Sequence, residues 1–142
     1  FLGHYSIVKQ PQQQESSNHS SQQYNGTSII LDMTELDTSV SQIGTIRDKV
    51  SFILDECRSS KLESSNSTIE VCVLLESPGG SAADYALAAQ QLLRLRNQPN
   101  ITVTVLVDKV AASGGYMIAC TSSPGQLYAA PFAVLGSIGV VG

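Results

Sequence analysis

The sequence lacks the features that mark membrane-spanning, nucleic-acid-binding and zinc-binding proteins. No apolar run reaches the roughly 20 residues needed to cross a bilayer, and no basic cluster accompanies the net charge of -4. The three cysteines, Cys57, Cys72 and Cys120, are widely spaced and form no Cys-x-x-Cys pair. We therefore expect buried thiols rather than a disulfide framework or a metal site, no cofactor, and no nucleic-acid partner.

Apolar residues are almost absent from Gln10 to Thr27, where Gln, Ser and Asn dominate. Such a segment cannot bury enough apolar surface to offset its chain entropy. Residues 1–27 are therefore predicted to be a disordered lead-in, with His4 and His19 exposed and without a catalytic role. The first residue is not Met, no signal-peptide profile follows it, and the last residues stop within an apolar stretch. We expect a piece of a longer protein, with one ordered domain from residue 28 to 142.

Strand and helix patterns alternate through that domain. Apolar strands are predicted at 28–33, 69–75 and 101–107, and helices at 37–57, 82–96 and 114–120, with two short strands near Tyr128 and within 133–141. Strands that are apolar on both faces and joined by helices predict a layered α/β fold with a mostly parallel sheet. The functional loops of such a sheet collect at the carboxyl ends of its strands.

Two glycine turns follow predicted strands, Glu76-Ser-Pro-Gly-Gly80 and Ala111-Ala-Ser-Gly-Gly115. Ser113 is a candidate nucleophile, which requires a base to take its proton and amide donors to hold the oxyanion that forms. The amides of Gly80 and Gly114 could be those donors, because no side chain obstructs them. Either turn alone is also consistent with ordinary packing, but the two together favour an acyl-transfer site. No Lys or His follows Ser113.

The order and spacing of several motifs resemble the signal peptide peptidase A family, in particular its SohB-type branch. The resemblance runs from about Ile29 to the end of the chain and rests on Leu75–Gly80, Tyr85–Arg96, Val107–Met117, Ala129–Phe132 and Gly136–Val140. It implies a Clp/crotonase-type fold and a membrane-associated serine endopeptidase that cleaves signal peptides and similar apolar peptides. Residues 28–142 would be the N-terminal part of such a peptidase domain.

The resemblance also implies the roles of individual residues. Ser113 matches the family's nucleophile, Gly80 and Gly114 match its oxyanion-hole positions, and Ser137 matches the serine that orients a lysine base. That lysine lies downstream of Gly142 in the family, so it is absent from this chain, which we expect to be inactive by itself. The loop at 121–128 is longer than the family's usual link and departs from its pattern.

Three other interpretations share parts of this pattern. A Clp-type protease would use a histidine after the serine, a crotonase-type enzyme would bind an acyl-CoA thioester, and an inactive homologue would only bind peptides. Lys109 is the one lysine near Ser113, but it stands at a strand exit and is predicted to be structural or solvent-facing. The family resemblance further implies a homo-oligomer and a bacterial-envelope or organellar membrane location, with any anchor outside this chain.

Overall fold

The computed structural model describes residues 5–9, 27–34, 36, 40–59 and 68–139. Along the chain its elements are β1 (Tyr5–Lys9), β2 (Thr27–Met33), α1 (Val40–Ser59), β3 (Ile69–Ser77), α2 (Ala82–Arg96), β4 (Ile101–Ala112), α3 (Gly114–Ala119), β5 (Leu127–Ala129) and β6 (Val134–Gly136). The strands form one sheet in the order β1-β2-β3-β4-β5, and β6 pairs with the end of β4.

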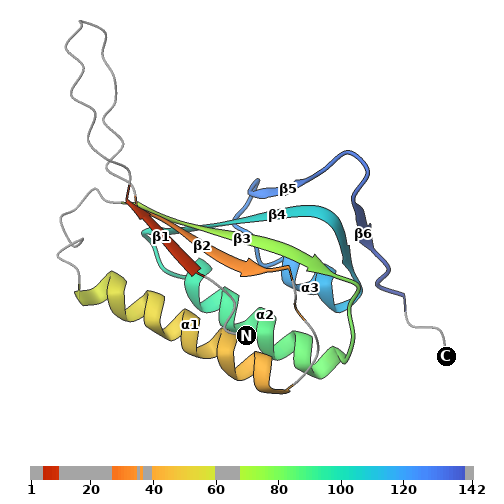
Figure 1. The fold of residues 1–142 in the computed structure, drawn as a ribbon, viewed down its shortest axis with the longest axis horizontal. Coiled ribbons are helices and arrows are strands. Elements are labelled where there is room, and N and C mark those ends of the chain that lie inside the picture. Colours follow the sequence, from red (N-terminus) through yellow and green to blue (C-terminus); the bar gives the residue numbers. More distant parts are fainter. Residues whose placement is uncertain (1–4, 10–26, 35, 37–39, 60–67, 140–142) are drawn as a thin grey trace, which may run out of the picture.

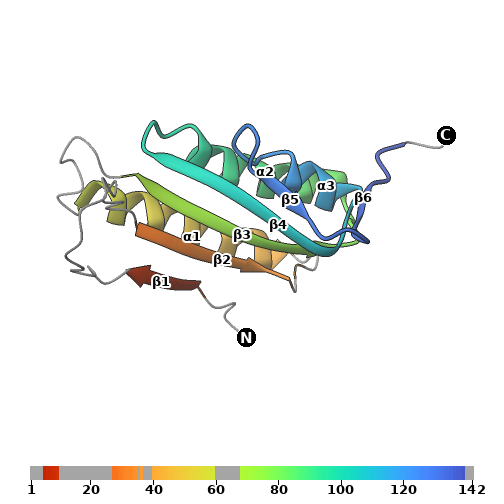
Figure 2. The same cartoon turned by 90° about the horizontal axis from the view of Figure 1, so that it is seen from above.

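The sheet is parallel except at one edge, where β1 runs antiparallel to β2. Parallel neighbours require a long crossover, and α1 and α2 are the crossovers from β2 to β3 and from β3 to β4. Both helices and α3 lie on the same face of the sheet (Figures 1 and 2). These observations confirm the layered α/β fold with helical crossovers, consistent with a Clp/crotonase-like architecture.

The core lies between the sheet and its helices. Along β3, the side chains of Ile69, Val71, Val73 and Leu75 are buried while those between them are at least partly exposed, as expected when alternate residues point to opposite faces. The helices close this core with Ile46, Val50 and Ile53 from α1 and Tyr85, Ala88, Leu92 and Leu95 from α2. The apolar stripe predicted for the first helix therefore faces the core.

Strand β4 bends near its carboxyl end. Leu75 pairs with Val107, but Ser77 pairs with Ala111, so residues 108–110 of β4 lie opposite the single residue Glu76 of β3. Extra residues on one strand of a pair bend that strand, and β4 curves strongly at this point (Figure 1). Before the bend β4 pairs with β5, and after it with β6. The bend brings the end of β4 beside the turn that follows β3.

Some sequence expectations differ from the structure. Strands β3 and β4 extend to Ser77 and Ala112, past their predicted ends, and β1 lies within residues 1–27, where no element was expected. Cys57 and Cys72 are half-buried, but the prediction of burial for Cys120 is wrong: this C-cap residue of α3 is exposed although Ala119 and Thr121 on either side of it are buried, because successive residues at a helix end face different directions. His4, His19 and residues 10–26 lie outside the described residues.

Replacing Leu92 with Ala should destabilise the fold strongly. Leu92 is fully buried between α2 and the sheet, and removing a core leucine side chain typically costs about 2–5 kcal/mol. We expect urea unfolding to report a loss in that range. Leu87→Ala is the matched control, because Leu87 lies on the same helix but is 54% exposed, and it should change stability by less than about 0.5 kcal/mol. Similar losses for the two variants would contradict the packing described above.

Candidate active site

Ser113 occupies the junction between β4 and α3. Its backbone has φ 53° and ψ -117°, a positive-φ conformation that non-glycine residues seldom adopt. A serine on such a strained strand-to-helix turn presents its hydroxyl away from the backbone, as in a nucleophile elbow. The residue is exposed even though Gly114 and Gly115 after it are buried. This geometry is consistent with the nucleophile predicted at this position.

The turn after β3 lies directly against this serine. A Cβ added to Gly79 would lie 2.6 Å from Ser113 Cβ, 2.7 Å from the Ala112 carbonyl oxygen and 3.0 Å from the Gly114 nitrogen. Gly79 also has φ 94°, which favours glycine on its own account. The two glycine turns recognised in the sequence are therefore in contact.

Gly114 and Gly115 pack just as closely against the opposite side of this region. A Cβ on Gly114 would be 2.3 Å from Tyr85 Cγ, and one on Gly115 would be 2.6 Å from the Ser77 carbonyl oxygen. Both positions therefore require glycine for space, since contacts this short do not occur for real Cβ atoms. The start of α3 is held against the end of β3 and the first turn of α2.

The amides of the two turns differ in their hydrogen bonds. Gly79 N–H donates to Ser77 Oγ at 3.2 Å, so it is turned toward the interior of the protein. Gly80 and Gly114 make no hydrogen bond through their N–H groups within the part of the chain that the structure describes. Gly114 is the first residue of α3, and the N–H groups in the first turn of a helix have no partner inside the helix. These two amides stay the predicted oxyanion donors.

Ser137 is brought next to the nucleophile segment by β6. Ser113 N–H donates to the Gly136 carbonyl oxygen at 2.7 Å, and Ala112 pairs with Gly136 in the sheet. Gly136 and Ser137 have φ values of 119° and 55°, so the chain turns sharply as it leaves β6. Ser137 is exposed beside this turn. Its predicted role in orienting a lysine is consistent with this place but is not tested by it.

Lys109 does not have the surroundings of a lysine base. Its side chain is 70% exposed, and Nζ lies 3.2 Å from both carboxylate oxygens of Glu76. A lysine acts as a base when burial disfavours its ammonium form, and Lys109 has no such burial. Its side chain faces solvent, as expected, and its structural role stays a prediction.

The described groups whose pKa values are shifted belong to residues other than Ser113, Gly80 and Gly114. Burial lowers the pKa of Lys49, against an opposing effect of the Asp32 charge. Burial is the main cause that raises the pKa values of Cys57 and Cys72, and a hydrogen bond with Cys120 raises the pKa of Tyr116. No group of three or more His, Cys, Asp or Glu residues that could hold a metal ion occurs in the described segments.

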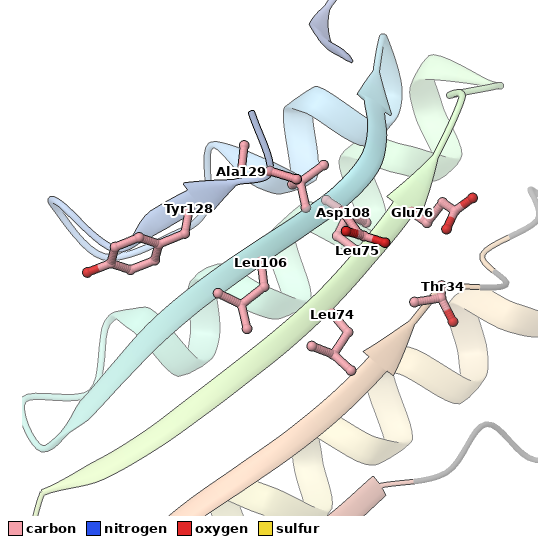
Figure 3. A pocket seen from close by; sticks show the side chains of 10 residues that line it. Thr34, Leu74, Leu75, Glu76, Leu106, Asp108, Tyr128 and Ala129 are labelled. Carbon is pink, nitrogen blue, oxygen red and sulfur yellow. The ribbon is translucent and has the colours of Figure 1, made fainter. Parts of the chain in front are cut away.

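An apolar hollow of about 280 Å³ lies on the helix-free face of the sheet. Leu74, Leu106 and Tyr128 line it from three adjacent strands, and Glu76 and Asp108 lie at one end (Figure 3). Its lining contains neither Ser113 nor the two candidate donor glycines. The hollow is thus a surface near the carboxyl ends of the strands that is distinct from the candidate site at the glycine turns.

Sequence reasoning missed the buried residues that hold the turns together. Ser77 and Tyr85 are fully or almost fully buried, with 0% and 2% exposure, and their hydroxyls lie 2.6 Å apart. The sequence does place a tyrosine eight residues after a serine, across a turn. Only the folded structure, however, shows that the two hydroxyls lie within hydrogen-bonding distance.

Fold and site together define a layered α/β protein with a serine on a strained strand-to-helix turn. Residues 96–142 match the family model described as peptidase family S49. The chain belongs to the SppA/SohB-like part of this peptidase family, as the motif resemblance implied.

Relatives of the chain carry the name SohB. A probable protease SohB of Haemophilus influenzae is 49% identical over 105 residues, 74% of this chain and 27% of that protein. Those of Buchnera aphidicola from Schlechtendalia chinensis and Schizaphis graminum are 46% and 43% identical, each over 72% of this chain and over 30% and 33% of their own lengths. The chain thus spans a third or less of these relatives.

Replacing Gly79 with Ala should destabilise the protein more than replacing Gly125 with Ala. Both glycines have positive φ, but only Gly79 lacks room for a Cβ. Backbone strain costs about 1–3 kcal/mol at either position, and the contact with Ser113 adds about 1–3 kcal/mol at Gly79. Thermal unfolding of both variants measures the difference. Equal losses would contradict the close contact between the two turns.

Proposed function

We propose that the full-length protein is a serine endopeptidase that uses a serine–lysine dyad and cleaves apolar peptides such as signal peptides. The observation that carries this proposal is the strained backbone of Ser113, held on a strand-to-helix turn against Gly79. Membership of a peptidase family supports the reaction class. The lysine is expected from the family resemblance and would be supplied by residues outside this chain.

In the proposed reaction Ser113 Oγ attacks the scissile carbonyl carbon and its proton moves to the neutral lysine amine. The N–H groups of Gly80 and Gly114 donate hydrogen bonds to the oxyanion that forms. The C–N bond then breaks, and the lysine returns the proton to the leaving amine. Water attacks the resulting ester by the same route and regenerates the serine. Ser137 would hold the lysine amine toward Ser113.

Apolar surface near the site supports an apolar substrate. Three large apolar side chains in or next to β6 are exposed: Phe132 by 96%, Val134 by 59% and Ile138 by 72%. Large exposed apolar side chains grouped in this way commonly mark binding surfaces. We propose that they contact the apolar peptide substrate. The homo-oligomer implied by the family resemblance stays a separate proposal.

Membrane association is proposed on the family resemblance alone. Among the described residues, no helix is both long enough and apolar enough to span a bilayer. An acyl-CoA enzyme of the crotonase type and an inactive peptide-binding homologue are the competing functions, and the experiments below separate them from a peptidase.

Replacing Ser113 with Ala in the full-length protein should abolish peptidase activity. Removal of a nucleophile lowers kcat by about 10⁴-fold or more in serine proteases. The measurement is hydrolysis of a fluorogenic apolar peptide together with labelling by a fluorophosphonate probe. Ser81→Ala is the matched control, since Ser81 is exposed at the start of α2 and makes no side-chain capping bond.

Activity retained by Ser113→Ala would rule out Ser113 as the nucleophile. An inactive wild-type protein that still binds the peptide would instead identify a non-catalytic homologue, and turnover of an acyl-CoA thioester would identify the crotonase-type alternative. We also expect the probe to label the full-length protein but not this chain alone, because the base is supplied from outside the chain.

Replacing Lys109 with Met should leave peptide hydrolysis nearly unchanged. The exposed ion pair with Glu76 stabilises the fold by no more than about 1 kcal/mol, and kcat should stay within about twofold of the wild type. The measurement is kcat as a function of pH for both proteins. A loss of about 10²-fold or more, which is typical for removal of a general base, would show that Lys109 is the base instead.

A further inference from the structure

One buried side chain contacts both turns that carry the proposed oxyanion donors. Tyr85 lies in the first turns of α2 and is 2% exposed. Its ring packs against Gly114, where a Cβ would come within 2.3 Å of Cγ and 2.6 Å of Cδ2. The ring therefore limits where the Gly114 backbone, and with it the Gly114 amide, can lie.

The hydroxyl of the same tyrosine reaches the other turn through Ser77. Tyr85 Oη lies 2.6 Å from Ser77 Oγ, which also accepts the Gly79 N–H at 3.2 Å. Ser77 is fully buried at the end of β3. The hydrogen bond from the Gly79 N–H orients the Pro78–Gly79 peptide plane. This plane is joined through the Gly79 Cα to the plane that carries the Gly80 N–H, so the bond restricts the turn from which the Gly80 N–H projects.

We propose that Tyr85 and Ser77 are positioning residues that hold the Gly80 and Gly114 amides in the geometry of an oxyanion hole. This inference rests on the proposed peptidase function. Neither hydroxyl would touch the substrate. Tyr85 acts on one amide through packing of its ring and on the other through the hydrogen bonds of Ser77.

The hydroxyl of Tyr85 is not needed to fill the core. Phenylalanine would supply the same apolar ring area, whereas a buried hydroxyl is tolerated only when it is hydrogen-bonded. A buried pair of hydroxyls that also binds a backbone N–H restricts the turn to one arrangement. Oxyanion stabilisation depends on such preorganisation, because donors that must reorient during the reaction contribute less.

The test is Tyr85→Phe in the full-length protein, which keeps the ring against Gly114 and removes the hydroxyl. We expect kcat to fall about tenfold with KM within about twofold, because the amides act on the transition state and not on the bound substrate. The inhibition constant of a peptide aldehyde, whose adduct with Ser113 places an oxyanion between the two amides, should rise by a similar factor.

Thr121→Val is the matched control. Thr121 is 3% exposed, and its hydroxyl donates to the Ile118 carbonyl oxygen at 2.7 Å, beyond the last residue of α3. This variant also loses one buried hydrogen bond, but it should keep the wild-type kcat and aldehyde affinity. Unchanged kcat and aldehyde affinity in Tyr85→Phe would overturn the inference, as would equal effects in the two variants.

Ser77→Ala gives a second approach and also serves if Tyr85→Phe does not fold. It should show the same loss of kcat at constant KM. The double variant Ser77→Ala/Tyr85→Phe should lose about as much as the more affected single variant, because the two hydroxyls act as one unit. Independent, multiplying losses would overturn the pairing.

Ser113→Ala, measured in parallel, separates the two levels of the proposal. An active wild type, an inactive Ser113→Ala and a fully active Tyr85→Phe would overturn the positioning role alone. An inactive wild type, or an active Ser113→Ala, would overturn the proposed function and the positioning role with it.

Discussion

The structure depends on a close backbone contact that only glycine permits. Gly79 comes so near to Ser113 and the Ala112 carbonyl that no side chain fits between the two turns. Because side chains are excluded, two backbone segments approach each other at the carboxyl ends of β3 and β4. The amides in these segments become available to a ligand for the same reason. The need for glycine and the exposure of backbone amides thus both follow from the close approach of the two turns.

The sheet produces this contact by an irregularity in its register. The extra residues of β4 opposite Glu76 bend the strand, so that its last residues leave β5 and pair with β6 instead. Without the bend, the edge of β4 that faces away from β3 would keep the same direction along its whole length. The bend therefore aims Ser113 at the turn after β3, and the β6 pairing places Gly136 against the Ser113 N–H. The described helices all lie on one face of the sheet, so none of them covers the opposite face (Figure 2).

The sequence predicts the layered fold well because its signals are local. Alternation and helical spacing define β3, α2 and β4, and the two glycine turns were placed at strand ends from their residues alone. The register shift in β4 could not be predicted, because it depends on pairing between residues distant in the chain. The Ser77–Tyr85 pair was missed for the same reason, and β1 because its pairing with β2 is also non-local. Cys120 was misjudged since a small apolar neighbourhood in sequence does not define which side of a short helix faces solvent.

The charge distribution around Ser137 is consistent with the proposed lysine base. Lys109 is the last charged residue of the sequence, and it is already paired with Glu76 in an exposed position. Around Ser137 the chain offers mainly apolar side chains, with Phe132, Val134 and Ile138 open to solvent. If a lysine amine entered this environment and these side chains became covered, desolvation would favour its neutral form, since few charges of this chain would oppose the change. A histidine base would not need such surroundings, because its ordinary pKa is already near neutrality. The exposed apolar side chains in and beside β6 are therefore better suited to the proposed lysine base than to a histidine base.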